Sequence, residues 1–571
     1  MLSQRGFGPG ATRGLHIAAL GLIVVLACAL YLPFLRNPLV FDDRFFFAQN
    51  LFSYYATHPL GLVTRAPAYF SLAFTEILFS RIEAHRLVSL FVHVGCAFAL
   101  YCLLYVLLQG VQNGSQAAAP GDHRRSAACA LVAAAGFAIH PAAVYGAAYL
   151  VQRSVVLATL FSLLSLVFLA RGLMRRAYAD AIWAGLLYAL AALCREHSIL
   201  LPAVAVPLAM LANPGTAFAL RYVALYLAVC APAALFVLIL MLGKQLFGQA
   251  YEPHVVEIAA QIEASSGSGS GSADLSWALS AVTQAGLFFR YLATWLWPDT
   301  STMAIDLRID PFVSWSSAWI AIKVAAFAAA GLFGLLLVRR RGTAGLIGLG
   351  LLYAWILFLP EFSVLRFQEP FVLYRSYLWA PGIALAVAAI LGVLGSRAAL
   401  AAFALACPLL MYQAHDRLTS FSSPLRLWED AADKLPQGPV PWGSRVLYEV
   451  GREYLYSGQP DKAIAAAERC VATYPGTWQC GYARGAIHMQ LEQYDRALPY
   501  FVRAAEMQPA SGIAQHRVGL ALEKLERIEE AKQRYRKAAS LGYRGGDMEL
   551  GRLGGATGAA APSANAVPAK P

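Results

Sequence analysis

Residues 219–242 read ALRYVALYLAVCAPAALFVLILML, and the charged side chain in this run is Arg221. A helix of about 20 mostly apolar residues is long enough to cross the hydrocarbon core of a bilayer. A helix that is apolar on all sides must be surrounded by protein or by lipid. The stretch therefore predicts a membrane-spanning helix.

The rest of the chain has a similar composition. Of its 571 residues, 58% are hydrophobic and 14% are charged, and the mean hydropathy is +0.54. Soluble globular chains carry about 25% charged residues. We therefore expect an integral membrane protein with a smaller soluble part.

The formal net charge of +12 does not indicate a nucleic-acid partner. The arginines lie in short loops between apolar runs and do not form a basic stripe, so the excess is a topology signal.

Apolar runs bounded by Arg, Pro, Gly or polar clusters predict an all-α membrane domain over residues 14–413. The expected spans are 14–34, 86–109, 127–149, 151–171, 179–194, 198–212, 219–242, 313–338, 343–360, 376–394 and 397–413, about eleven in all. The short runs 179–194 and 198–212 could instead merge or re-enter. No small-residue cleavage pattern follows the first run, so we expect it to stay attached.

Orientation follows from the loops that carry arginine, because such loops favour the cytoplasmic side. The groups are Arg5/Arg13, Arg124/Arg125, Arg171/Arg175/Arg176, Arg221, Arg339/Arg340/Arg341 and Arg397. With eleven spans, all six groups lie on one side when residues 1–13 are cytoplasmic. The first external loop 35–85, the segment 243–312, the loop 361–375 and everything after residue 414 are then external.

The external segment 243–312 contains a Ser/Gly run at 265–272, which has no apolar side chain and predicts a flexible linker. The aromatic stretch 287–298 is too short to span and predicts an interfacial helix.

A repeat of period 34 begins at residue 443. The equivalent positions are Gly451, Gly485 and Gly519; Ala463, Ala497 and Ala531; Cys470, Ala504 and Ala538; Ala467, Phe501 and Tyr535. Small residues at these offsets let two antiparallel helices approach closely. The pattern predicts three tetratricopeptide repeats over 443–545, forming an α-solenoid. We expect a linker at 414–442 and a disordered tail at 546–571.

The repeats could be a scaffold that binds nothing, or they could offer a groove to a partner protein, a common use of solenoid faces. Cys470 and Cys480 lie in this part, outside the reducing cytosol by the predicted topology. A disulfide between them is permitted there, but the sequence does not give its geometry.

Two adjacent acids follow the first span in the stretch Val40-Phe41-Asp42-Asp43-Arg44-Phe45. Adjacent carboxylates repel, so at least one should have a raised pKa or pair with a cation. Either acid could serve as a base. The alternative is a solvated loop or a helix N-cap, where Asp is favoured.

Further short motifs occur along the chain after this pair. They are Ser53-Tyr54-Tyr55, Arg65 to Ser71, His85, His93, His140-Pro141, Gln152-Arg153, Cys194-Arg195-Glu196-His197, Trp297-Pro298, Asp306, Tyr374-Arg375-Ser376-Tyr377-Leu378 and Pro381-Gly382. Together with the acidic pair and the terminal repeats, this order resembles the transmembrane and tetratricopeptide-repeat-containing protein O-mannosyltransferases. The resemblance covers about residues 14–545.

The resemblance implies a glycosyltransferase of the GT-C fold, which takes a sugar from a polyprenyl-phosphate donor on the external face. It implies that the acidic residues Asp42 and Asp43 belong to the catalytic site, with Asp42 as the preferred general base. Glycosyl transfer also needs cations to stabilise the leaving phosphate.

The candidate phosphate-binding residues are Arg375, Arg65, Arg153 and Arg195. For each of them except Arg375, a boundary arginine that reaches toward the headgroups is an equal alternative.

We expect His93, His140, Glu196 and Tyr374 to line the polar cavity of the site; for each histidine, packing between helices is the alternative that the sequence favours. The histidines show no spacing of two His and a carboxylate on one helix, so neither a metal nor another cofactor is predicted.

The predicted function is O-glycosylation of an exported protein by a lipid-linked monosaccharide, with the repeats holding the acceptor. The compact, Ala/Arg-rich chain favours a bacterial inner membrane, with undecaprenyl phosphate as the lipid and periplasmic repeats. Two other functions stay open. One is a ligase or polymerase that uses a pyrophosphate-linked glycan, and the other is a non-catalytic membrane scaffold that presents the repeats.

Overall fold

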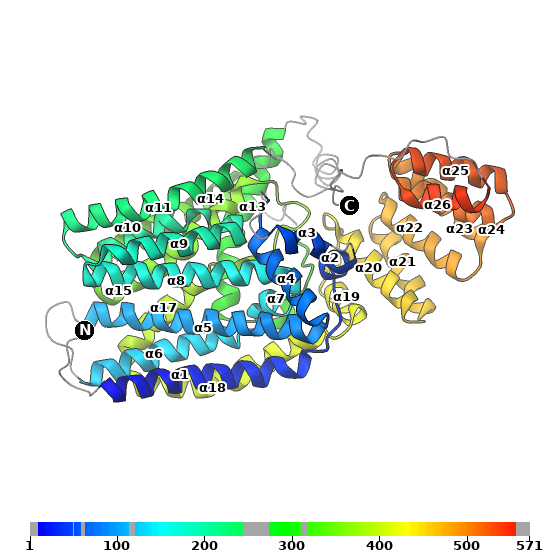
Figure 1. Cartoon of the computed structure of the whole chain (residues 1–571). Coiled ribbons are helices and arrows are strands. Elements are labelled where there is room, and N and C mark those ends of the chain that lie inside the picture. Colours follow the sequence, from blue (N-terminus) through cyan, green and yellow to red (C-terminus); the bar gives the residue numbers. More distant parts are fainter. Residues whose placement is uncertain are drawn as a thin grey trace. The chain divides into compact units, whose positions relative to one another are not determined.

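The computed structural model describes residues 9–48, 51–58, 63–112, 120–243, 273–309 and 317–554. Within these ranges the regular elements are helices and no β-strand occurs, which confirms the predicted all-α class (Figure 1). The chain forms two units. The first comprises residues 1–255, 266–305 and 311–424, and the second comprises 256–265, 306–310 and 425–571.

The first unit contains the long apolar helices. Its α-helices are α1 (Pro9–Tyr31), α2 (Asp42–Ala48), α3 (Leu51–Thr57), α4 (Ala66–Phe79), α5 (Ile82–Gln112), α6 (Pro120–Ala138), α7 (Val144–Ala147), α8 (Arg153–Arg175), α9 (Tyr178–Cys194), α10 (Ala205–Ala212), α11 (Thr216–Gly243), α13 (Ala273–Leu296), α14 (Ser317–Arg340), α15 (Gly342–Phe358), α16 (Leu373–Ser376), α17 (Ala380–Leu394) and α18 (Ser396–Ser420). Short 3₁₀ helices join them: η1 (Leu32–Phe34), η2 (Pro141–Ala143), η3 (Leu150–Gln152), η4 (Glu196–Val204), η5 (Thr300–Thr302) and η6 (Leu359–Ser363).

Seven helices of the described part are long and apolar enough to cross a membrane, and a bent pair of helices raises the number to eight. The predicted spans 179–194, 198–212 and 376–394 fall on shorter apolar helices. The helices therefore fit a membrane domain, and eleven complete spans stay a prediction.

The bent pair occupies the predicted span 127–149, where α6 and the segment Pro141–Ala147 meet at 52°. Pro141 lacks the N–H that would continue the ladder of α6. The ring of His140 instead accepts a hydrogen bond from the N–H of Ala142 (3.2 Å) and stacks on Trp295 with 4.3 Å between centroids. This break begins a run of short helices that leads to the N-terminus of α8.

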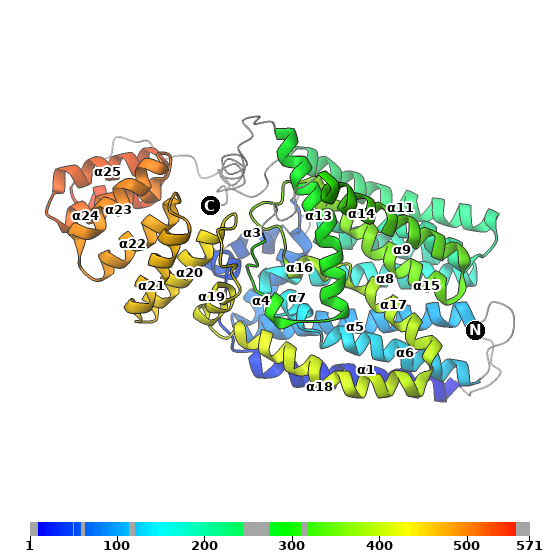
Figure 2. The same cartoon turned by 180° about the vertical axis from the view of Figure 1, so that it is seen from behind.

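Helix α13 carries the aromatic stretch 287–298 up to Leu296 and runs crosswise to the long helices α15, α17 and α18 (Figure 2). An interfacial helix would have this orientation if the long helices cross a bilayer. The Ser/Gly run 265–272 lies outside the described residues.

The second unit consists of short helices joined into hairpins. They are α19 (Pro424–Asp433), α20 (Gly443–Tyr456), α21 (Pro460–Thr473), α22 (Trp478–Gln490), α23 (Tyr494–Met507), α24 (Gly512–Lys524), α25 (Ile528–Ser540) and α26 (Arg544–Arg552). Three hairpins, from α20 to α25, match the predicted period. Helix α26 takes residues 546–552 out of the predicted tail, and residues 555–571 lie outside the described part.

Two glycines of the period show why the hairpins need them. A Cβ at Gly485 would lie 2.8 Å from the ring of Phe501, and one at Gly519 would lie 2.6 Å from the ring of Tyr535. Real Cβ atoms do not come so close, so each aromatic ring of the second helix requires glycine on the first. The register predicted from the sequence therefore has a steric basis.

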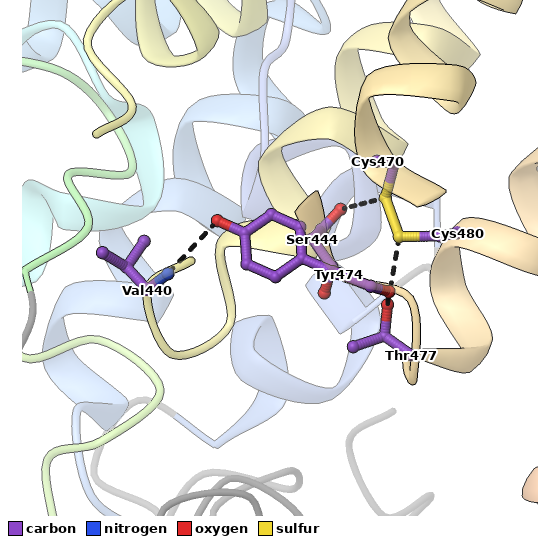
Figure 3. Close-up of a disulfide and its surroundings, with 6 residues drawn as sticks. All are labelled: Val440, Ser444, Cys470, Tyr474, Thr477 and Cys480. Carbon is purple, nitrogen blue, oxygen red and sulfur yellow. Dashed lines mark hydrogen bonds between the residues drawn. A yellow bond between two sulfur atoms is a disulfide. The ribbon is translucent and has the colours of Figure 1, made fainter. Parts of the chain in front are cut away.

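The structure joins Cys470 of α21 to Cys480 of α22 in a disulfide, with 5.3 Å between the Cα atoms (Figure 3). The hydroxyl of Thr477 lies 3.0 Å from the Cys480 sulfur, and the hydroxyl of Tyr474 accepts a hydrogen bond from the N–H of Val440 (3.4 Å). Closing so short a loop stabilises the fold by about 3 kcal/mol in the chain-entropy model. The bond ties the first hairpin to the second.

The boundary of the second unit differs from the predicted one, because residues 306–310 of the external segment belong to this unit. Asp306 is buried, pairs with Arg308 and lies 3.8 Å from the guanidinium of Arg445 on α20. Deleting the repeats would expose this pair, so point substitutions test their role more cleanly than a truncation.

Candidate functional site

The two adjacent acids occupy different environments at the start of α2. Asp42 is exposed, and its backbone N–H donates to the hydroxyl of Tyr149 (3.1 Å). Asp43 is fully buried, and its carboxylate accepts hydrogen bonds from the N–H groups of Leu150 (3.2 Å) and Val151 (2.8 Å). Of the two acids, Asp42 is therefore the one that reaches solvent, and Asp43 is the one that holds η3 in place.

Asp43 also titrates in an unusual range. Burial raises its pKa to about 7, while the N–H groups of Val151 and Leu150 and the guanidinium of Arg86 lower it. A folded-state pKa above the unfolded value means that the folded protein binds the proton more tightly. The stability that this group contributes is therefore full below about pH 4 and is lost as the pH rises toward 7.

We predict that Asp43→Asn destabilises the first unit and shifts this pH dependence. The asparagine has one oxygen for two backbone N–H groups, and an unsatisfied buried N–H costs about 1–3 kcal/mol. Thermal unfolding between pH 5 and pH 8 checks this: the stability of the wild type should fall with pH more steeply than that of the variant. Equal slopes would remove Asp43 as the titrating group.

Tyr149 and Tyr374 connect Asp42 to the cations of the site. Their rings lie 6.1 Å apart, edge to face. Burial raises the pKa of Tyr374 to about 12; Glu369 and Asp42 add to the rise, and Arg375 and Arg195 oppose it. The geometric link from Asp42 to Tyr374 runs through Tyr149, which accepts the Asp42 N–H and packs against the ring of Tyr374.

Two arginines flank the ring of Tyr374, at 5.8 Å for Arg195 and 6.0 Å for Arg375. The guanidinium of Arg195 is buried and donates to Gln152 (3.4 Å) and Ser154 (3.3 Å). These contacts hold it beside the ring.

Arg65 and Glu196 form a two-contact ion pair, one of whose hydrogen bonds measures 3.1 Å from Nε to Oε2. Arg65 lies just before α4 with a positive φ of 67°, a conformation that an unstrained arginine rarely adopts. Both side chains are about 85% buried, so a carboxylate already compensates this arginine.

Arg375 contacts two acids that the sequence analysis did not select. Its guanidinium lies 3.5 Å from Glu361 and 3.6 Å from Glu369, and it donates to the carbonyl of Glu369 (3.0 Å). Arg366 and His197, also missed, lie 3.1 Å from the two oxygens of Glu361. The signal was present, because ionisable residues at a membrane boundary mark functional sites; four of them cluster in the predicted loop 361–375.

Three predicted site residues, Arg153, His93 and His140, have hydrogen-bond or stacking partners within the protein. Arg153 is fully buried and donates to Ser89 (3.1 Å), Thr75 (3.2 Å) and the carbonyls of Ser71 (3.1 Å) and His85 (2.6 Å). This environment favours helix packing over the predicted phosphate contact.

The ring of His93 is also buried, between the hydroxyl of Tyr377 (2.6 Å) and the carbonyl of Ala138 (2.8 Å). His140 stabilises the bend after α6. Both side chains have partners within the protein, and their place in the wall of a polar cavity stays a prediction. In the part of the chain that is described, no three His, Cys, Asp or Glu side chains gather as a metal would require.

The charged residues of this region form linked pairs. Arg195 and Arg375 lie beside the ring of Tyr374, Arg375 also contacts Glu361 and Glu369, Arg366 contacts Glu361, and Arg65 contacts Glu196. Counted with the exposed carboxylate of Asp42, the four arginines are matched by four acids. Guanidinium groups can bind phosphate oxygens, and this is the chemistry that these arginines offer.

Comparison with known proteins identifies the second unit. Residues 444–477, 482–511 and 514–541 match the family model of the tetratricopeptide repeat. This part of the chain is an array of tetratricopeptide repeats. The array and the apolar helices fit the architecture of the family that the sequence resembles.

A curated relative, BBSome complex member BBS4 of Mus musculus, is 27% identical over 131 residues. The match covers 23% of this chain and 24% of that protein, so the chain spans about a quarter of its length.

Among solved structures, a MamA fragment from Desulfovibrio magneticus RS-1 is 24% identical, with a TM-score of 0.18 over 21% of this chain and 64% of that one. The Cut9–Hcn1 hetero-tetramer of the APC/C is 13% identical, with a TM-score of 0.20 over 87% and 80% of the two chains. We build no argument on either likeness.

Proposed function

We propose that this protein is a GT-C type glycosyltransferase that moves a sugar from a polyprenyl-phosphate donor to a hydroxyl of an extracytoplasmic protein. The observation that carries the proposal is the exposed Asp42, whose backbone N–H donates to Tyr149, while the ring of Tyr149 packs against Tyr374 and Arg195 and Arg375 lie beside that second ring. A base and phosphate-binding cations at one site are what glycosyl transfer needs.

The reaction assigns a role to each group. Asp42 accepts the proton of the acceptor hydroxyl as its oxygen bonds to the anomeric carbon, while the bond from that carbon to the phosphate oxygen breaks. The leaving polyprenyl phosphate gains negative charge, which Arg375 and Arg195 stabilise. Asp43 anchors the start of α2, which carries Asp42, to η3.

The repeats have the role of an acceptor-binding module in this proposal. Tetratricopeptide arrays generally mediate contacts between proteins. The Cys470–Cys480 disulfide supports an extracytoplasmic location for them, because such bonds persist in oxidising compartments. The proposed location is a bacterial inner membrane with the repeats in the periplasm.

The topology is testable by reporter fusion. A reporter that is active only outside the cytoplasm should give signal when fused after residue 430 and none when fused near Arg175, because the arginine-bearing loops favour the cytoplasm. Signals in the reverse pattern would place the repeats and Asp42 on the cytoplasmic side.

The donor class separates the proposal from its rivals. The purified chain in nanodiscs would be given an exported-protein fraction and either a labelled polyprenyl-phosphate monosaccharide or a labelled polyprenyl-pyrophosphate oligosaccharide. We expect label in protein with the first donor alone. Label from the second alone would favour a ligase, and label from neither would favour a scaffold.

A further inference from the structure

Glu361 is a buried carboxylate that the mechanism above does not use. It lies in η6 at the end of α15 and is 1% exposed. An ionised group in such a place is costly unless charged or hydrogen-bonding partners compensate it. Glu361 has three such partners, each of them buried.

The partners converge on its two oxygens. Oε2 lies 3.1 Å from Nε of Arg366 and 3.5 Å from Nη1 of Arg375, and Oε1 lies 3.1 Å from Nε2 of His197. Two guanidinium groups thus share one carboxylate oxygen, although their charges repel each other. Without the carboxylate, this repulsion would drive the two guanidinium groups apart.

We propose that Glu361 is a positioning residue that holds Arg366 and Arg375 side by side as a pair of contacts for the donor phosphate, an inference that rests on the proposed function. Each guanidinium carries five N–H donors in a planar fork, a geometry that lets one arginine bind more than one oxygen atom at a time. A pair held at one point can engage two oxygens of a phosphodiester.

Two neighbours fix this arrangement in relation to Asp42. Arg375 also donates to the carbonyl of Glu369 (3.0 Å) and lies 6.0 Å from the ring centre of Tyr374, which packs against Tyr149, the acceptor of the Asp42 N–H. His197 fixes the other side of the carboxylate.

Direct electrostatics and positioning predict opposite results for Glu361→Gln. By Coulomb's law alone, removing a negative charge near a bound anion strengthens its binding. Loss of the pairing instead lets the arginines separate, which weakens binding. The sign of the change in donor affinity therefore decides between the two effects.

The experiment measures the KM for a polyprenyl-phosphate monosaccharide and kcat for the full-length chain in nanodiscs. Glu361→Gln should raise the donor KM at least about fivefold, within the range of coupling between contacting residues, with less than about a threefold change in kcat. In an Arg375→Ala background the same change should have a clearly smaller effect on KM, because Glu361 acts through that arginine. Glu361→Asp keeps the charge but retracts it by one methylene, so a smaller rise is expected.

Asp180→Asn is the matched control. Asp180 is also a buried carboxylate paired with an arginine, Arg171 (2.6 Å), and lies on α9. The Asp180→Asn variant should have lower thermal stability and an unchanged donor KM.

An unchanged or lower KM in Glu361→Gln, or an effect fully additive with Arg375→Ala, would overturn the positioning role while leaving the proposed function in place. If Glu361→Gln does not accumulate in the membrane, Glu361→Asp replaces it in the test: a higher donor KM supports the positioning role, and an unchanged or lower donor KM overturns it. An inactive wild type would overturn both.

Discussion

Asp42→Asn should lower kcat for sugar transfer by about 10²- to 10⁴-fold, the usual contribution of a general base. Asparagine keeps the size of the side chain but cannot accept the proton of the acceptor hydroxyl. Because Asp42 is exposed, we expect the variant to fold normally. The donor KM should change little. Steady-state kinetics with a labelled polyprenyl-phosphate monosaccharide measures both quantities.

Asp461→Asn is the matched control, since Asp461 is also an exposed acid in the first turn of a helix, α21. It should leave kcat unchanged. The roles within the acidic pair would be exchanged if Asp43→Asn, corrected for the amount of folded protein, abolished transfer while Asp42→Asn kept it.

Arg375→Ala should weaken donor binding about ten- to a hundredfold and also slow transfer. A hydrogen bond to a charged group contributes about 1.5–3 kcal/mol, which corresponds to that range of affinity. The slower step follows because Arg375 also faces the charge that develops on the leaving phosphate. Arg375→Lys should restore only part of the loss, because an ammonium lacks the planar fork of the guanidinium. Donor titration and single-turnover rates measure the two effects.

Arg171→Ala provides the comparison, since Arg171 also pairs with a buried carboxylate, that of Asp180. We expect this variant to bind donor normally. If Arg171→Ala and Arg375→Ala weakened donor binding equally, general destabilisation would explain the effect of Arg375→Ala.

The 34-residue period was enough to predict the repeats from the sequence, whereas apolar runs were not enough to predict the length of every membrane-spanning helix. The glycines at 485 and 519 are required by rings one helix away, so the same contact that builds the hairpin also leaves a period in the sequence. The predicted spans at 179–194, 198–212 and 376–394 have no repeated pattern of this kind that would fix their length. Apolar composition predicts burial in protein or in lipid equally well, and these runs form helices shorter than a bilayer requires.

The site shows a similar division. The acidic pair at Asp42 and Asp43 could be found from charge in an apolar chain, but their separate environments depend on η3, over 100 residues away. For Arg153 the sequence left a phosphate contact and a boundary role open, because it does not reveal the four oxygen atoms to which this side chain donates. Glu361 shares the predicted loop 361–375 with its partners Arg366 and Arg375, so part of its environment could be found from the sequence; its third partner, His197, comes from η4, which the sequence does not bring beside that loop.

The most direct measurement is a single-turnover experiment on the wild-type chain in nanodiscs with a labelled polyprenyl-phosphate monosaccharide and an exported-protein fraction. The account predicts that the labelled sugar leaves the lipid and appears on protein in the wild type, and that Asp42→Asn binds the same donor but keeps it intact. A wild-type chain that neither binds nor consumes this donor, or an Asp42→Asn chain that consumes it at the wild-type rate, would contradict the assignment of a glycosyltransferase with Asp42 as its base.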